Sequence, residues 1–290
     1  MPPRRAETQP CHTPRKGRTA VSAVRFEQED SLGRIVLASP PFNFVSAQYS
    51  NDLIAAVHDA AESDIRALLI HAEGPNFSVG GAVHEWPGKT HNWFRTFVAE
   101  VTSSYRALEA LRIPVVAAIR GQTTGGGLEL ALSADFIVAS DNTVLWCVEI
   151  TTAQVPLAGG YQRLASLIGP GAARRLVMLG EQTPVTQVPQ VADFIVPDDQ
   201  LDEAALDLAM RLSQGPTRAY AAAKSILKAW WAGGIAAADK LMLDLSVDNT
   251  YSTEDARNGF RSGAAAIEAL LRGEEPPNGD AGIHTKFVGR

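Results

Sequence analysis

Cysteine is scarce in this chain of 290 residues, which has only Cys11 and Cys147. We expect Cys11 to lie in a disordered N-terminal segment, so a framework of disulfide bonds is excluded as a source of stability. This use of cysteine predicts a reducing, cytoplasmic location.

Long apolar runs and continuous basic stretches are also missing. The apolar stretches VVAAI (115–119) and FIVAS (136–140) end after a few residues, whereas a helix needs about 20 apolar residues to cross a bilayer. The net charge is −6, and acids and bases are interspersed after residue 20. We therefore expect neither a membrane protein nor a nucleic-acid-binding protein.

The first twenty residues differ in composition from the rest of the chain. Residues 1–20 contain five Lys or Arg and one acid, are rich in proline and lack the apolar block of a signal peptide. We predict a flexible basic tail. An organelle transit peptide is the alternative interpretation, and the prolines disfavour the amphipathic helix that it would need.

What the sequence does contain is a pattern of short strands and helices. Hydrophobic residues make up 46% of the chain, which is enough for a sizeable core. Strand-like segments surround helical stretches at 47–63 and 93–111, which predicts an α/β core over 21–200. The helical segments 203–213, 217–231 and 235–247 predict a helical region over 201–272, followed by a flexible tail at 273–290.

Three consecutive glycines precede an apolar helical pattern in RGQTTGGGLELA (120–131). Glycines at the start of a helix expose N–H groups without intrahelical partners and favour bound anions. A phosphate-binding P-loop is excluded because no Gly-Lys-Ser/Thr follows, and the spacing is not G-x-G-x-x-G. Taken alone, the triplet is equally consistent with tight packing of a helix on a sheet.

A second glycine segment, NFSVGGA (76–82), also follows a strand and is expected to enter a helix. Two N–H donors from separate loops are what an oxyanion hole requires. Together with VPLAGGYQRLASLIGPGAARRLVMLGE (155–181), these motifs resemble the enoyl-CoA hydratase/isomerase, or crotonase, superfamily in order and spacing. The resemblance extends from about residue 22 to about residue 260.

The resemblance implies a crotonase fold, which is an α/β core made of a spiral of ββα repeats with a C-terminal helical region. It also implies an acyl-CoA thioester as substrate and a homotrimer or a dimer of trimers as the assembly. It implies no metal ion or redox cofactor, since coenzyme A enters as part of the substrate. We expect Trp230 and Trp231, at the end of a helix, to pack between subunits and not to bind a ligand.

Carried over by position, the resemblance places the oxyanion N–H groups on Gly81 and Gly126 and the acid/base carboxyls on Glu129 and Glu149. Glu129 follows Gly126 by one helical turn, so its side chain can face the same cavity. Two neighbouring carboxyls in a pocket of low dielectric repel, so that one stays protonated while the other is charged. The implied reaction adds water to a 2-enoyl-CoA, Glu129 deprotonating the water that attacks C3 and Glu149 orienting it and protonating C2.

The residues alone leave other interpretations open. Glu129 could be a capping or salt-bridged residue, and Glu149 could be an exposed acid at a strand end. The fold is shared by enzymes that move double bonds, decarboxylate, or cleave C–C or C–halogen bonds, and by catalytically silent binding subunits. Binding of RNA has no support in the sequence after the tail.

The resemblance also implies substrate contacts around the glycine loops and after Glu149. The residues concerned are Asn43, Val79, Gly80, Ala82, His84, Gly125, Cys147, Thr152, Pro156 and Leu157.

Several positions depart from the family pattern. Ala82 stands where many members have Asp, and Leu157 replaces a common glycine. Thr151, Thr152 and Gln154 are more polar than the aliphatic residues usual after the second glutamate, which favours an oxygenated or otherwise unusual acyl group. Pro184 and Pro189 predict that the helix expected near 183–192 is rearranged.

A group of aromatic and histidine side chains follows Gly81, where we expect it to line the acyl pocket or to pack in a loop. It has neither the spacing nor the thiolate partner of a zinc site. We expect Cys147 to be a small buried residue and not a nucleophile. The aromatic and histidine residues are His84, Trp86, His91 and Trp93.

Overall fold

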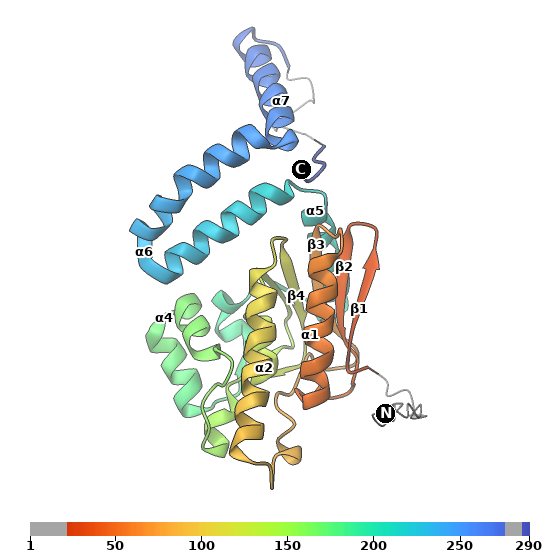
Figure 1. Cartoon of the computed structure of the whole chain (residues 1–290), viewed down its shortest axis with the longest axis vertical. Helices are drawn as coiled ribbons and strands as arrows, with labels where there is room; N and C mark the ends of the chain where they lie inside the picture. The colour runs from red at the N-terminus through yellow and green to blue at the C-terminus, as the bar shows by residue number, and fades with distance from the viewer. Residues whose placement is uncertain (1–21, 276–285) are drawn as a thin grey trace, which may run out of the picture.

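The computed structural model describes residues 22–275 and 286–290. The basic tail expected at 1–20 and most of the tail expected at 273–290 therefore lie outside the described residues. The centre of the protein is a six-stranded sheet in the order β1-β2-β3-β4-β6-β9, in which β1 is antiparallel to β2 and the other pairs are parallel (Figure 1). Its strands are β1 (Val24–Glu29), β2 (Leu32–Leu37), β3 (Ala67–Ala72), β4 (Val115–Ile119), β6 (Phe136–Ser140) and β9 (Phe194–Val196).

A second, smaller sheet contains β5 (Gln122–Thr124), β7 (Val144–Trp146) and β8 (Thr183–Pro184). The chain passes from β4 through β5 into helix α3 (Gly126–Ala131), and from β6 through β7 and a short 3₁₀ turn towards α4 (Gly160–Leu179). Each passage is one strand of the large sheet, one strand of the small sheet and one helix. The predicted crotonase fold with its ββα repeats is therefore confirmed.

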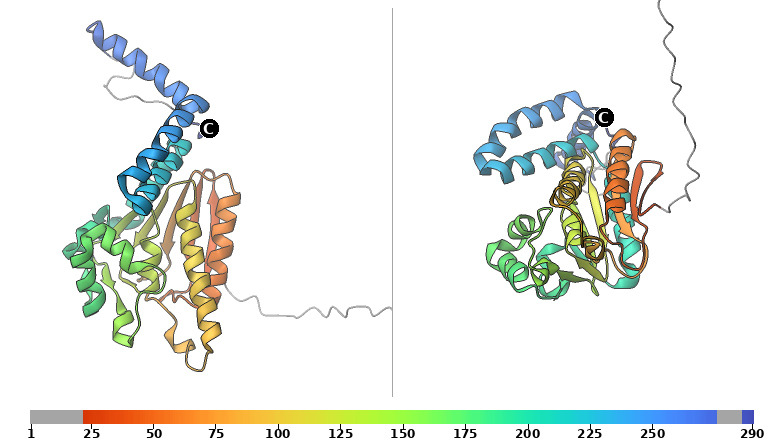
Figure 2. Two further views of the ribbon diagram at one scale, coloured as in Figure 1. Left: turned by 60° about the vertical axis from the view of Figure 1, so that its left-hand side comes forward. Right: turned by 60° about the horizontal axis from the view of Figure 1, so that its bottom comes forward.

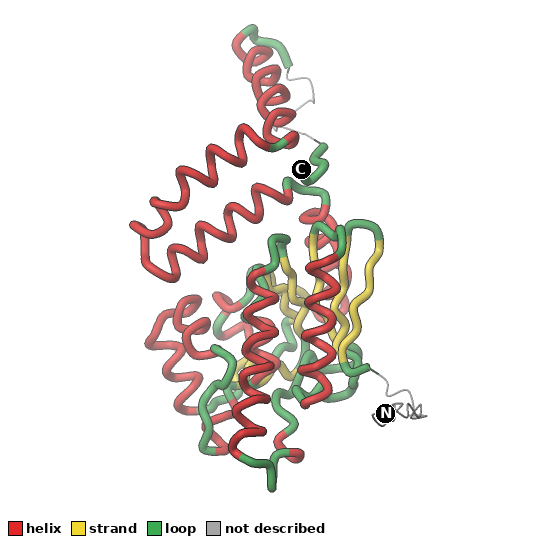
Figure 3. The backbone as a smooth tube through the Cα atoms, viewed as in Figure 1, coloured by secondary structure: helices red, strands yellow, loops and turns green. Residues whose placement is uncertain are grey.

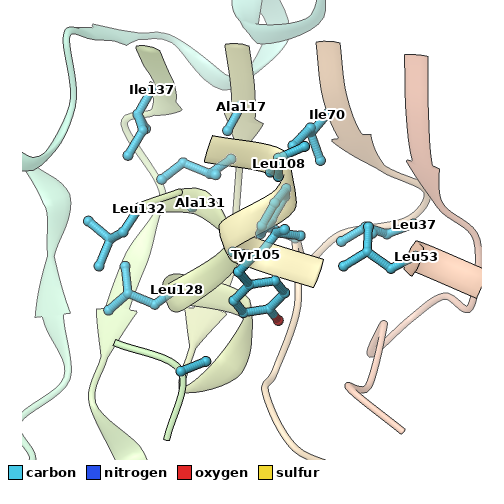
Figure 4. Close-up of a cluster of buried hydrophobic side chains, with 14 of the residues drawn as sticks. Leu37, Leu53, Ile70, Tyr105, Leu108, Ala117, Leu128, Ala131, Leu132 and Ile137 are labelled. Carbon is cyan, nitrogen blue, oxygen red and sulfur yellow. The ribbon is translucent and has the colours of Figure 1, made fainter. Parts of the chain in front are cut away.

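Helices cover both faces of the large sheet, as Figure 3 shows. Helices α1 (Ala47–Glu62) and α2 (His91–Ala110) lie on one face, and α5 (Leu201–Ser213) packs on the other. The side chains of β4 alternate accordingly, since Val115 and Ala117 join the core under α2 (Figure 4) while Val116 and Ala118 join the core under α5. Because both faces of β4 are covered by helices, every residue of VVAAI is buried, which explains why the strand is apolar throughout.

The C-terminal part consists of α6 (Thr217–Ser252) and α7 (Glu254–Leu271), which extend away from the sheet (Figure 2). Helix α6 folds back on itself at Gly233 and Gly234, whose backbone angles are not helical. The break predicted between 217–231 and 235–247 is therefore found. Within the described ranges, no helix has the length and apolar character needed to cross a membrane.

Two sequence predictions concern short segments, one around Pro184 and Pro189 and one directly after Gly81. The prolines at 184 and 189 do rearrange their segment, which contains β8 and two 3₁₀ turns. The prediction of a helix directly after Gly81 was wrong. Only the turn η1 forms there, because Pro87 and a left-handed Gly88 (φ +79°) prevent a helix from continuing. The 3₁₀ turns are η1 (Val83–Glu85), η2 (Val148–Thr152), η3 (Val185–Gln187), η4 (Pro189–Val191) and η5 (Asp198–Gln200).

Candidate active site

The two glycine segments meet beside the small sheet. Gly80 (φ +85°) and Gly125 (φ +49°) both have left-handed backbone angles, which glycine adopts without strain. A Cβ at Gly80 would lie 2.9 Å from the Thr124 carbonyl oxygen and 3.4 Å from the Gly125 Cα. Side chains at these positions would separate the loops, so the glycines are needed for the contact.

The backbone N–H groups of Gly81 and Gly126 donate no hydrogen bond within the described part of the chain. Val45 pairs with Gly81 in a parallel bridge in which the Val45 N–H donates to Gly80 O (2.9 Å) and the Ala82 N–H donates to Val45 O (3.1 Å). These bonds flank Gly81, so its own N–H points to the opposite side. Gly126 is the first residue of α3, where an N–H has no acceptor in the helix. Neither N–H has a hydrogen-bond acceptor among residues 22–275 and 286–290.

Both glycines border one pocket with an empty volume of about 540 Å³, its open mouth included. Most of its wall is apolar, and the polar side chains are two carboxyls, a hydroxyl and an amide. The wall consists of Val45, Gly81, Val83, Trp86, Phe97, Val98, Val101, Gly125, Gly126, Glu129, Val148, Glu149, Thr152, Gln154, Leu157 and Ala158.

Helix α3 carries the Glu129 carboxyl into this pocket. The side chain is nearly completely buried, and its Oε1 accepts the N–H groups of Ala158 (2.7 Å) and Gly160 (2.8 Å). Burial raises the pKa of Glu129 to about 7, repulsion by Glu149 adds to this rise, and the two N–H donors oppose it. Since Gly160 begins α4, the carboxyl also caps that helix, and its Oε2 accepts no hydrogen bond within the described part of the chain.

The Glu149 carboxyl enters the pocket from the turn η2, and the residue is 9% exposed. Its Oε1 lies against Gly125, 3.3 Å from where a Cβ would stand. Its Oε2 is buried and has no hydrogen-bond partner in the described ranges, and burial raises the pKa of this carboxyl. A buried oxygen without a partner is costly unless water or a ligand donates to it. Glu149 is thus a pocket residue and not an exposed acid.

Seven of the residues expected from the sequence form the wall of the pocket, and seven lie outside it. Asn43 is among the second group, and its amide bonds the backbone of Ser39, Glu73 and Asn76, which gives it a role in holding the loops. Burial raises the pKa of the Cys147 thiol to about 12, so the residue is not a thiolate nucleophile. Those in the wall are Gly81, Gly125, Gly126, Glu129, Glu149, Thr152 and Leu157. Those outside are Asn43, Val79, Gly80, Ala82, His84, Cys147 and Pro156, for which substrate contact stays a prediction.

Of the aromatic and histidine side chains expected after Gly81, only Trp86 lines the pocket. Its ring packs edge-on against Phe94 and covers Gly81, whose missing Cβ would lie 2.8 Å from Trp86 Cζ2. His84 lies against Phe44, 5.1 Å between ring centroids, and Trp93 stacks on Phe97. These rings belong to the packing around the pocket, and in the described residues no group of His, Cys, Asp and Glu could hold a metal ion.

Sequence reasoning missed the wall that α2 provides. Phe97, Val98 and Val101 face the pocket from this helix, and Val45 faces it from the segment before α1. The helical spacing of the apolar residues was visible, but it identifies a buried face without saying whether that face meets the core or a cavity.

Comparison with known proteins agrees with this geometry. A spiral of ββα repeats with two touching glycine loops defines a crotonase-fold protein, and the family model described as enoyl-CoA hydratase/isomerase matches residues 27–264. The Mycobacterium tuberculosis protein named "Probable enoyl-CoA hydratase EchA17" is 31% identical over 202 residues, covering 68% of this chain and 77% of that protein. Another from that species, "Probable enoyl-CoA hydratase echA8", is 28% identical over 247 residues, covering 83% and 93%. The chain belongs to the enoyl-CoA hydratase/isomerase family.

Solved structures show the same fold. An enoyl-CoA hydratase from Bacillus anthracis superposes with a TM-score of 0.79 at 24% identity, covering 92% of this chain and all of that one (100%). An enoyl-CoA hydratase from Geobacillus kaustophilus superposes with a TM-score of 0.81 at 21% identity, covering 94% and 98%. Each superposition covers more than nine tenths of this chain, so the fold is shared over most of its length.

Proposed function

We propose that this protein is an enoyl-CoA hydratase, which adds water across the C2=C3 bond of a 2-enoyl-CoA thioester. One observation carries the proposal: two buried carboxyls, Glu129 and Glu149, share a pocket with the free N–H groups of Gly81 and Gly126. The names of the relatives support it. We propose no metal or redox cofactor, since every step below uses a protein group.

The two N–H groups stabilise the thioester oxygen as it becomes an enolate oxygen. Each donor of this kind contributes about 3 to 4 kcal/mol to the transition state when the site is preorganised and dry. The apolar wall of the pocket excludes water from this position and so strengthens the interaction. This part of the mechanism needs main-chain groups only.

The carboxyls supply the proton transfers. Glu129 is anchored through Oε1 and keeps Oε2 for a water molecule, while the unpartnered Oε2 of Glu149 can bind the same water. Because burial raises both pKa values, and the charge of Glu149 adds to the rise at Glu129, the pair retains a proton near neutral pH. The reaction requires the shared proton of the pair to lie on Glu149. The water oxygen then attacks C3, its proton passes to the ionised Glu129, and Glu149 gives its proton to C2. The proton on Glu129 returns to Glu149 before the next turnover.

The test follows the absorbance of the enoyl thioester when 2-butenoyl-CoA is mixed with the protein. We expect the absorbance to fall with the native chain and to persist with Glu129→Gln and Glu149→Gln. The exposed Glu203→Gln on α5 is the control and keeps the native rate. A stable absorbance with the native chain, together with conversion of a 3-enoyl-CoA, would identify an isomerase instead.

We also propose the homotrimer or dimer of trimers that the resemblance implies. Helix α6 supports it, because large apolar side chains there face solvent in the single chain, among them Trp230 (45% exposed) and Trp231 (56% exposed). Apolar patches of this kind mark protein–protein interfaces.

A further inference from the structure

Tyr105 on α2 contacts the backbone of the proposed oxyanion site. Its hydroxyl donates to the carbonyl oxygen of Gly126 at 2.8 Å. The side chain is completely buried, and Figure 4 shows its ring among the aliphatic side chains of the core. A residue 21 positions earlier in the chain therefore holds the first residue of α3.

The bond matters because Gly126 has no side chain with which to fix itself. The peptide group that contains its free N–H begins at the Gly125 carbonyl, which accepts the Glu129 N–H at 3.0 Å. On the other side of the Gly126 Cα, the carbonyl is held by Tyr105. These two bonds fix the peptide planes on both sides of the glycine, and so the direction of its N–H.

A purely structural explanation is that a buried phenol needs some acceptor. Tyr49 on α1 shows that this core does not demand a carbonyl for each phenol. It is also buried, its hydroxyl lies beside that of Tyr105, and it bonds no backbone carbonyl in the described ranges. Of these two neighbouring phenols, therefore, only Tyr105 bonds the backbone of Gly126.

We infer that Tyr105 is a positioning residue, whose hydrogen bond to the Gly126 carbonyl aims the Gly126 N–H at the thioester oxygen. The inference rests on the proposed function of Gly81 and Gly126. Tyr105 does not touch the reacting atoms and acts through the backbone. Burial and the neighbouring Tyr49 raise the pKa of Tyr105, so the hydroxyl keeps its proton and donates throughout the working pH range.

The experiment compares Tyr105→Phe with Tyr49→Phe. Each removes one hydroxyl from the same buried cluster, so a general effect on folding lowers both alike. We expect Tyr105→Phe to lower kcat about 10-fold to 100-fold, less than the loss of a whole donor, with KM nearly unchanged. We expect Tyr49→Phe to stay within about twofold of the native kcat.

A second measurement reads the oxyanion site directly. Infrared spectra of bound 2-butenoyl-CoA labelled with ¹³C at C1 report how strongly the thioester carbonyl is polarised. We expect the lowered carbonyl frequency of the native complex to move back towards the free value in Tyr105→Phe and not in Tyr49→Phe.

Equal losses of kcat in the two variants, or an unchanged carbonyl frequency in Tyr105→Phe, would overturn the inference. Failure of the proposed function has a different signature, since the native chain itself would then leave 2-butenoyl-CoA unconverted.

Discussion

Helix α3 buries its apolar residues, whereas helix α6 leaves many of its apolar residues exposed to solvent. All residues of α3 from Gly127 to Ala131 are buried, although the helix has six residues and could not persist alone. Helix α6 has 36 residues, of which Ala221 and Ala238 are buried, while Ile235 is 70% exposed. The pocket residues described above all come from one chain, whereas the C-terminal helices leave apolar side chains exposed. We therefore expect chemistry and assembly to depend on separate regions.

The largest expected effect lies in the α3 region. Replacing Glu129 or Glu149 by Gln should lower kcat about 10²-fold to 10⁴-fold, because an amide cannot transfer the proton. A glutamine oxygen at 129 can still accept the N–H groups of Ala158 and Gly160, so the fold should persist. Initial rates with 2-butenoyl-CoA test the first part, and size-exclusion chromatography tests whether assembly is unchanged. A variant that retains the native rate contradicts the proposed mechanism.

The buried Glu129 should also make stability depend on pH. Its pKa is about 7 in the folded protein and about 4.5 in the unfolded chain, so between these values the folded state binds more protons. The free energy of unfolding should thus fall as pH rises through this window, by up to about 3 kcal/mol, with no further change above it. Urea unfolding of the native chain and Glu129→Gln at pH 4.5, 6 and 7.5 measures the difference. Parallel pH profiles would show that the pKa is not raised.

Replacing glycine by alanine should change the free energy of unfolding in opposite directions next to α3 and in the C-terminal helices. Gly125→Ala forces a left-handed residue and places a Cβ 3.3 Å from the Glu149 carboxyl, so we expect about 1 to 3 kcal/mol of destabilisation. Gly259→Ala on α7 meets open space in a helix, and we expect up to about 1 kcal/mol of stabilisation. Chemical denaturation measures both. Equal changes would remove the distinction between the regions.

The smallest effect on chemistry is expected from the C-terminal helices. Trp230→Lys combined with Trp231→Lys should shift the assembly to smaller species by analytical ultracentrifugation, because the charges resist burial. The rate per subunit should change by less than about threefold, since neither residue lines the pocket. An unchanged sedimentation profile would place the subunit contacts elsewhere.

The sequence was sufficient to predict the elements with strong periodicity. The apolar strand at 115–119 and the helix that α2 forms were found close to their actual bounds because burial imposes clear patterns on them. The strands β5, β7 and β8 have two or three residues each, too few for any alternation to show. The small sheet was therefore missed.

The glycine loops and the two glutamates of the candidate site were predictable from the sequence, whereas the rest of the pocket wall was not. The segment after Gly81 forms a short turn and not the expected helix. The direction of the Gly81 N–H is set instead by the bridge to Val45, which is distant in the sequence and could not be foreseen from it. The wall from Phe97 to Val101 depends on how α2 is rotated over the sheet. Tyr105 resembles any core aromatic until its hydroxyl is seen at Gly126.

The double use of the Glu129 oxygen limits how this site can change. Any replacement at 129 must still offer an acceptor to the two amides at the start of α4, or that helix loses its cap. The Glu149 carboxyl holds no backbone N–H of another residue in the described ranges, so we expect substitutions there to cost less stability than those at Glu129. A descendant of this protein that acquires a different reaction should therefore first alter position 149.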